Sequence, residues 1–356
     1  MRKTLLKAIL YLTQYFCVTL APVSMLRDIE LPFSTITGLS AEFARLDAMM
    51  DEAASELGIP KFDLKMNMKV NLAYGLRNGF SEKDIRLALV NFGKRSQDIT
   101  KPRNNPPDFF DQTLGSLNRH LKRFFDNGNI SVTMDDFHFL PGRGACMDPV
   151  NSVIYSRAYD PDPGFVFRDE EEDILLVNFH ECLHFFAVGF CNGFLDEAFV
   201  EYFSINEVSS IFKIDHCTDI VPMVNFCSAL LERMKFMYDG DEQEARDTLR
   251  RMYITGDVEL LKRLLPGDEF EIIYLLMRPG TFSSYNGLLI DMVLGRLQKE
   301  KIKLFKELLT LENKTNKTLL DHGRIFRLKI QLMGQRTEKL TDLITLPAKQ
   351  AFVSAA

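Results

Sequence analysis

Residues 168–189 read RDEEEDILLVNFHECLHFFAVG, a run that is apolar on almost every face of a helix. Inside it lie the imidazoles of His180 and His184 and the carboxylate of Glu181. A helix that is hydrophobic all round is a buried helix. Burying each of these polar groups without a partner would cost roughly 1–3 kcal/mol. The run therefore predicts a buried helix that holds either a metal ion or a dense hydrogen-bond network.

The spacing of the two histidines favours the metal. Asp169 is the predicted N-cap of the helix, and Glu172 completes a capping box three residues later. His180 and His184 then lie one turn apart on one face, where both can bind one metal ion. Glu181, next to the first histidine, is placed to polarise a water molecule on that metal. The motif alone is weak evidence, because at average composition it arises by chance in roughly one chain in a hundred of this length. A buried helix with satisfied histidines is the alternative.

A second segment, NGFLDEAFVEYF, strengthens the metal hypothesis. Asn192-Gly193 forms a turn, and the residues after it read as a new helix. Glu197 can supply the third protein ligand that a hydrolytic zinc site requires. Glu201, one turn later, is placed to accept the free N–H of a ligand histidine from the outer shell. Asp196 is a rival third ligand, although an aspartate in the first turn more often serves the helix dipole.

These two segments resemble the gluzincin clan of metallopeptidases, which includes thermolysin and the neutral zinc aminopeptidases. The clan's Asn-Glu-x-x-x-Asp/Glu element is matched by Asp196–Glu201, with Asp at the first position, after a link from the histidine helix that is shorter than usual. The resemblance implies that His180, His184 and Glu197 are the zinc ligands. It also implies that Glu181 is the general base.

Two further stretches are similar to the aminopeptidase branch of the clan. SSYNGLLIDMVLGRL is similar to its Tyr-x-Lys-Gly helix, which implies that Tyr285 donates a hydrogen bond to the oxyanion, although the lysine is missing. A tyrosine on a helix is otherwise a core residue far more often than a catalytic one. Gly144–Asp148 loosely matches the strand that holds a substrate's amino terminus. The strand Ser152–Arg157 is then expected to be an edge strand that pairs with an extended peptide.

The expected function is zinc-dependent peptide hydrolysis, with a metal-activated water and a glutamate general base. The expected partner is a peptide or protein substrate, and the residues do not separate endopeptidase from exopeptidase. The alternative is a non-catalytic gluzincin-like binding or scaffolding protein that retains a zinc site. A helical protein with a chance motif is a third hypothesis, and it requires both histidines and both glutamates to be coincidences.

Charge and cysteine content limit the other function classes. The net charge of -6 and the absence of a basic block argue against nucleic acid as a partner. Six widely spaced cysteines without a Cys-x-x-Cys pair favour a reduced chain and the cytoplasm. Residues 1–25 form a signal-like or amphipathic segment, and residues 1–21 would direct secretion if they are a signal. No other stretch is expected to span a membrane. The oligomeric state is left open.

The order of predicted elements gives an α+β fold that is mostly helical. At 356 residues and 46% hydrophobic content, the chain can bury a large core. Helical runs at 40–58 and 81–93 each end at a glycine, a Pro- and Asn-rich linker follows at 100–110, and a helix is expected at 114–125. Strands are predicted at 130–134 and 152–157, in a small antiparallel sheet. The predicted parts after the N-terminal segment are a helical region at 26–127, the sheet with the zinc-binding helix pair at 128–210, and a C-terminal helical subdomain at 211–356.

Overall fold

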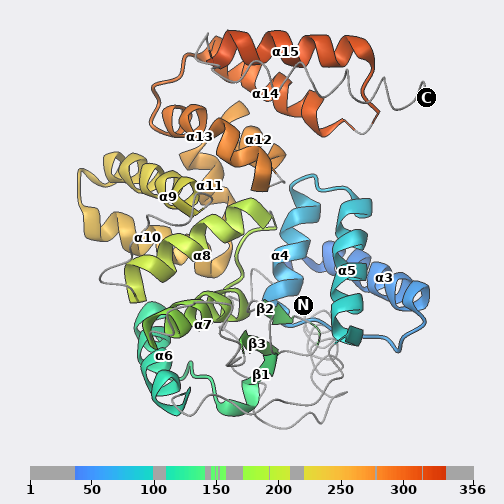
Figure 1. Ribbon diagram of the computed structural model, residues 1–356, viewed down its shortest axis with the longest axis vertical. Coiled ribbons are helices and arrows are strands. Elements are labelled where there is room, and N and C mark those ends of the chain that lie inside the picture. The colour runs from blue at the N-terminus through green and yellow to red at the C-terminus, as the bar shows by residue number, and fades with distance from the viewer. Residues whose placement is uncertain are drawn as a thin grey trace, which may run out of the picture. The chain divides into compact units, whose positions relative to one another are not determined.

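The computed structural model describes residues 37–98, 110–140, 146–148, 150, 153–157, 171–191, 193–208, 220–276, 279–314 and 316–333. The described residues are mostly helical and include one three-stranded sheet (Figure 1). This confirms the predicted α+β, mostly helical fold class. The N-terminal segment 1–25, the predicted cap Asp169 and all of the predicted linker except Phe110 lie outside the described residues.

The chain divides into two compact units. The first comprises Met1–Cys191, Phe203–Phe212 and Tyr253–Gly256, and the second comprises Asn192–Tyr202, Lys213–Met252 and Asp257–Ala356.

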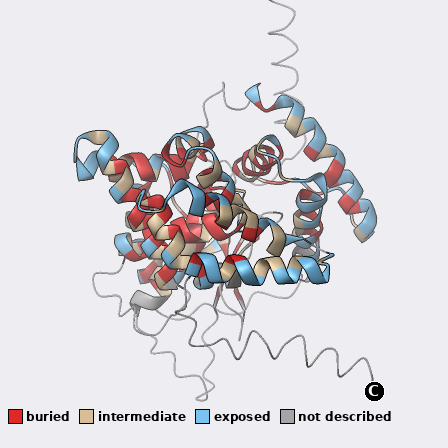
Figure 2. Cartoon of the chain, turned by 90° about the horizontal axis from the view of Figure 1, so that it is seen from above, coloured by how far each residue is buried: buried red, intermediate tan, exposed pale blue. Residues whose placement is uncertain are grey.

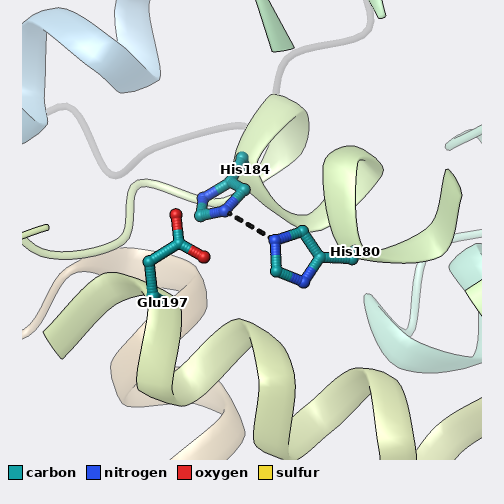
Figure 3. A group of neighbouring side chains, drawn as sticks. All are labelled: His180, His184 and Glu197. Carbon is teal, nitrogen blue, oxygen red and sulfur yellow. Dashed lines mark hydrogen bonds between the residues drawn. The ribbon is translucent and has the colours of Figure 1, made fainter. Parts of the chain in front are cut away.

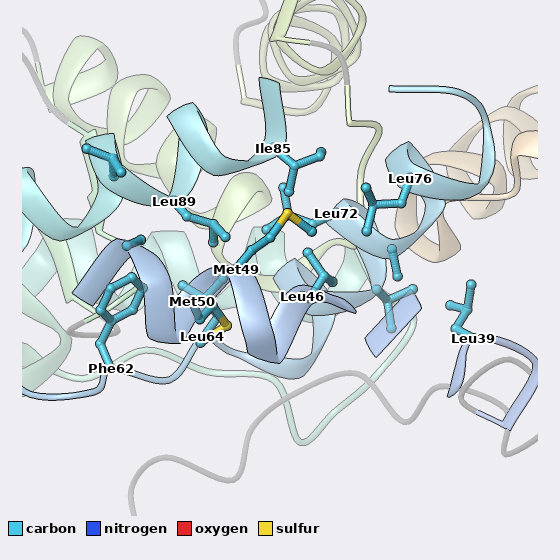
Figure 4. Close-up of a cluster of buried hydrophobic side chains, with 14 of the residues drawn as sticks. Leu39, Leu46, Met49, Met50, Phe62, Leu64, Leu72, Leu76, Ile85 and Leu89 are labelled. Carbon is cyan, nitrogen blue, oxygen red and sulfur yellow. The ribbon is translucent and has the colours of Figure 1, made fainter. Parts of the chain in front are cut away.

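The first unit begins with three helices that share a core: α3 (Ser40–Leu57), α4 (Met66–Arg77) and α5 (Glu82–Asp98). As predicted, α3 ends at a glycine, Gly58, whose φ of 64° is the left-handed conformation that glycine adopts without strain. Figure 4 shows the leucine and methionine side chains of the three helices packed together.

The predicted end of the next helix at Gly93 is wrong, because α5 continues through it to Asp98. A Cβ atom at Gly93 would lie 2.5 Å from Cδ1 of Leu57 on the neighbouring helix α3. Gly93 therefore serves close helix packing rather than helix termination.

The predicted strand at 130–134 is also wrong. These residues follow α6 (Phe110–Phe124) and lead into the short 3-10 helix η2 (Met134–Asp136). The backbone of Val132 pairs with the side chain of Asn118 on α6: its N–H donates to Oδ1 at 2.7 Å, and its carbonyl accepts from Nδ2 at 2.8 Å. The side-chain amide of Asn118 thus bonds the backbone N–H and carbonyl of Val132, which in a strand would bond a neighbouring strand.

The sheet contains β1 (Phe137–Leu140), β2 (Cys146–Asp148) and β3 (Val153–Arg157), in the order β1-β3-β2. β2 pairs antiparallel with β3, but β1 pairs parallel with it, with Phe137 opposite Ile154. The expectation of a purely antiparallel sheet is therefore corrected: the chain reverses twice between β1 and β3, which restores its direction. Because β3 lies in the centre, 152–157 is not the edge strand that was expected to receive a peptide.

The predicted buried helix is α7 (Glu171–Phe186), which packs against α6, β2 and β3. Most of its apolar residues are buried, and Phe179 and Leu183 are fully so, whereas Val177 is 42% exposed. The next helix, α8 (Gly193–Val208), is also buried along most of its length. Figure 2 colours the described residues by burial and shows helices that carry buried positions on one side and exposed positions on the other.

The described residues of the second unit lie mostly in helices, of which α8 and α10 (Glu242–Thr255) have their last residues in the first unit. Those after α8 are α9 (Ile220–Lys235), α10, α11 (Val258–Leu264), α12 (Asp268–Leu275), α13 (Pro279–Val293), α14 (Lys299–Asn313) and α15 (Leu319–Met333), with the 3-10 helix η4 (Phe236–Tyr238) after α9. α9 packs on α13, while α14 packs on both α12 and α15. The helical C-terminal region is as predicted. None of the described helices combines the length and the apolar character needed to cross a membrane.

Candidate metal centre

The side chains of His180 and His184 meet on one face of α7. Their Nε2 atoms are 3.3 Å apart, and their ring centroids are 5.0 Å apart with an angle of 72° between the planes. Residues four apart on a helix are neighbours on its surface, so the geometry follows from the sequence spacing. Both side chains are partly buried, with 16% of the His180 side chain exposed.

Glu197 of α8 completes a group of three. Among the described residues, His180, His184 and Glu197 form the one group of metal-ligating side chains whose ligand atoms all lie within 4.8 Å of one another. Figure 3 shows the two rings and the carboxylate turned toward one another. Two imidazoles and a carboxylate are a donor set that binds divalent transition metals. The group could therefore hold a metal ion.

The distance between the two nitrogens fits such an ion. Two imidazoles bound tetrahedrally at the usual zinc–nitrogen bond length place their nitrogens roughly 3.3–3.4 Å apart. The observed Nε2 to Nε2 distance is 3.3 Å. A long hydrogen bond between one protonated and one unprotonated ring nitrogen has the same length. The distance thus fits a metal ion with bonds of about this length to nitrogen, and it does not identify the element.

Glu181 lies beside this group. Its Oε1 is 4.0 Å from Nε2 of His180, and the residue is only 8% exposed. A carboxylate held this close to two neighbouring imidazoles is in a position to exchange a proton with a water molecule beside them.

The neighbouring cysteine on α7 has a different role. Cys182 is fully buried, as expected for a small hydrophobic residue, and burial raises the pKa of its thiol well above the usual value. It is a free cysteine. A protonated, buried thiol is a poor metal ligand, and Cys182 is not in the metal-ligating group formed by the described residues.

The other two acidic candidates lie on α8. Asp196 is in the first turn of the helix and is not in the metal-ligating group found among the described side chains. This position is the one in which a carboxylate stabilises the helix dipole. Glu201 is partly buried one turn after Glu197. Its hydrogen bond to a ligand histidine stays a prediction.

Tyr285 lies on α13 and is 2% exposed. Its hydroxyl donates a hydrogen bond to Oε1 of Glu312 on α14 at 2.8 Å, and its ring packs against Phe305 of the same helix. Burial, with the nearby Glu312 carboxylate, raises the pKa of Tyr285. The described contacts of the hydroxyl therefore join α13 to α14, and its role as an oxyanion donor stays a prediction.

The turn after α7 is held by backbone atoms from the end of α10. The N–H groups of Val188 and Gly189 donate to the carbonyls of Ile254 and Tyr253, at 2.9 and 3.1 Å. Gly256 has a φ of 63°, and a Cβ atom on it would lie 2.6 Å from Cγ1 of Val188 and 2.8 Å from the carbonyl oxygen of Gly189. Sequence analysis missed this contact, because no local pattern pairs residues so far apart in the chain.

Replacing Gly256 by alanine is expected to lower the free energy of unfolding by about 2–4 kcal/mol, since left-handed strain adds to overpacking. Gly240→Ala is the matched control: its φ is 88°, and no atom lies within 4 Å of a Cβ there. The control should cost only the strain, about 1–2 kcal/mol. Urea unfolding of both variants measures the difference. Equal losses would show that the space beside Val188 is not limiting.

No family model matches the chain, and the searches of curated proteins and of solved structures also found no match. The resemblance to gluzincins thus rests on the residues of the motifs alone.

Proposed function

We propose that the protein is a zinc-dependent peptide hydrolase. The observation that carries this proposal is the convergence of His180, His184 and Glu197, whose ligand atoms lie within 4.8 Å of one another. The Nε2 atoms of the two histidines are 3.3 Å apart, which is about the separation of two nitrogens bound to one zinc ion. Glu181 beside them supplies the group that a hydrolytic site needs in addition to its ligands.

Each residue has a defined part in this proposal. His180, His184 and Glu197 hold the zinc ion. When bound, zinc acts as a Lewis acid that lowers the pKa of a water molecule and polarises a carbonyl oxygen. Glu181 accepts a proton from the attacking water and delivers it to the leaving amine. Its low exposure limits competition from bulk water for the same proton.

The substrate class proposed is a peptide or protein. This rests on the gluzincin-like motifs, and it leaves open whether the chain is cut internally or from an end.

A non-catalytic gluzincin-like protein that retains its zinc is the second candidate. One observation favours it: the hydroxyl of Tyr285, the expected oxyanion donor, donates to Glu312. A binding or scaffolding protein needs no such donor.

Elemental analysis of protein purified without chelators tests the proposal, followed by incubation with a mixed peptide library and mass spectrometry of the products. About one zinc ion per chain is expected, with cleavage that stops when the zinc is removed and returns when it is added back. Zinc without cleavage would support the second candidate. A well-folded protein that binds no zinc would contradict both.

A further inference from the structure

Two asparagines of α4 lie against the C-terminal end of α7. Nδ2 of Asn67 donates to the carbonyls of Phe185 and Ala187, at 3.1 and 2.9 Å. Nδ2 of Asn71 donates to the carbonyl of Val188 at 2.6 Å. Both asparagines are buried, with exposures of 3% and 7%. They are four residues apart, so they form one polar stripe on an otherwise apolar helix face.

One of these bonds satisfies a carbonyl that α7 cannot satisfy itself, that of Phe185, and the other two hold the carbonyls of Ala187 and Val188 just after the helix. The last carbonyls of a helix have no partner within the helix and must be bonded elsewhere when they are buried. The ammonium group of Lys65, the N-cap of α4, lies 3.2 Å from the ring centroid of Phe185, where its charge also suits the negative end of the helix dipole. Helix α4 and its N-cap residue thus cap the end of α7 from outside.

His184 is part of the capped turn. It directly precedes Phe185, and the N–H of Ala187 donates to the carbonyl of Leu183 at 2.9 Å, which continues the helical turn around His184. A shift of the carbonyls held by Asn67 and Asn71 would rotate this turn. The distance from Nε2 of His184 to Nε2 of His180 would then change.

We infer that Asn67 and Asn71 are positioning residues of the metal centre. The inference rests on the proposed function and deepens it. The two amides fix the last turn of α7 and the turn that follows it, and thereby hold His184 at bonding distance from a metal shared with His180. Helix α4 is accordingly part of the scaffold of the site.

The test compares Asn67→Ala, Asn71→Ala and the double variant with Asn78→Ala. Asn78 is a matched control because its amide, on the same stretch of chain, donates to the carbonyl of Tyr74 within α4 and not to α7. Zinc affinity is measured by competition with a chromophoric chelator, and the visible spectrum of the cobalt-substituted protein reports the ligand geometry. Loss of a partner that bonds a metal ligand directly lowers metal affinity about 10–100-fold. Because Asn67 and Asn71 act through the backbone beside His184, a loss at the lower end of this range is expected for Asn67→Ala and Asn71→Ala. The control should match the wild type in affinity and spectrum.

Only folded protein enters the comparison, as judged by circular dichroism. If an alanine variant fails to fold, it is replaced by Asn67→Ser or Asn71→Ser, which keeps a shorter donor. The serine variant is also expected to lose zinc affinity, but less than the alanine variant would. Lower thermal stability with unchanged affinity and cobalt spectrum would overturn the inference and leave the metal site standing. A wild-type protein that binds neither zinc nor cobalt would overturn the proposed function, and the inference with it.

Discussion

His184→Ala is expected to abolish stoichiometric zinc binding while the protein stays folded. The variant leaves one imidazole and one carboxylate, and two protein ligands do not make the three that a catalytic zinc site requires. Zinc affinity should fall by more than it does when an outer-shell partner is removed, which is about 10–100-fold. Elemental analysis and chelator competition measure it. His322→Ala, which removes an exposed histidine of α15, is the control and should bind zinc as the wild type does.

The adjacent residues Glu197 and Asp196 give a sharper version of the same test. Glu197→Gln removes the carboxylate that belongs to the group, whereas Asp196→Asn removes one that does not. Both changes delete one negative charge from the first turns of α8. Zinc affinity should therefore fall in the first variant only. Equal losses of zinc affinity would mean that the overall negative charge, and not coordination, attracts the metal. A larger loss for Asp196→Asn would mean that Asp196, and not Glu197, is the third ligand.

Glu181→Gln is expected to abolish peptide hydrolysis without loss of zinc. The amide keeps the size of the side chain but cannot accept the proton of water, and a general base contributes roughly a hundredfold to ten-thousandfold to the rate. Zinc content should remain that of the wild type, because Glu181 is not one of the three candidate ligands. The hydrolysis rate of a peptide found in the library screen and the zinc content of the same preparation are the two measurements. Full hydrolytic activity in this variant would refute the proposed mechanism.

Tyr285→Phe separates two roles of the buried tyrosine. If the hydroxyl only joins α13 to Glu312 of α14, the variant should lose about 0.5–1.5 kcal/mol of stability and keep its turnover number. If the hydroxyl stabilises an oxyanion, the turnover number should fall about a hundredfold or more with the KM unchanged. The observed bond to Glu312 predicts the first result.

Much of the fold was predictable because helices are local structures. The apolar periodicity of 40–57 and the all-round apolar character of 174–186 required no knowledge of the rest of the chain, and both segments are helices in the structure. The errors arose where a distant residue decides the outcome. Gly93 reads as a helix end until Leu57 is seen beside it. The segment 130–134 reads as a strand until the side chain of Asn118 is seen to bond its backbone.

For the candidate site, too, the local features could be predicted from the sequence and the long-range ones could not. The sequence by itself determined that His180 and His184 face one another, since four residues are about one turn of an α-helix. It also placed Glu197 on the following helix. Only the tertiary structure decided that the carboxylate of Glu197 lies within 4.8 Å of both histidines and that Tyr285 bonds to Glu312. It also decided that Asn67 and Asn71 hold the end of α7 and the turn after it. The physical reason is range: periodicity records which face of a helix is buried, but not which distant residues are packed against it.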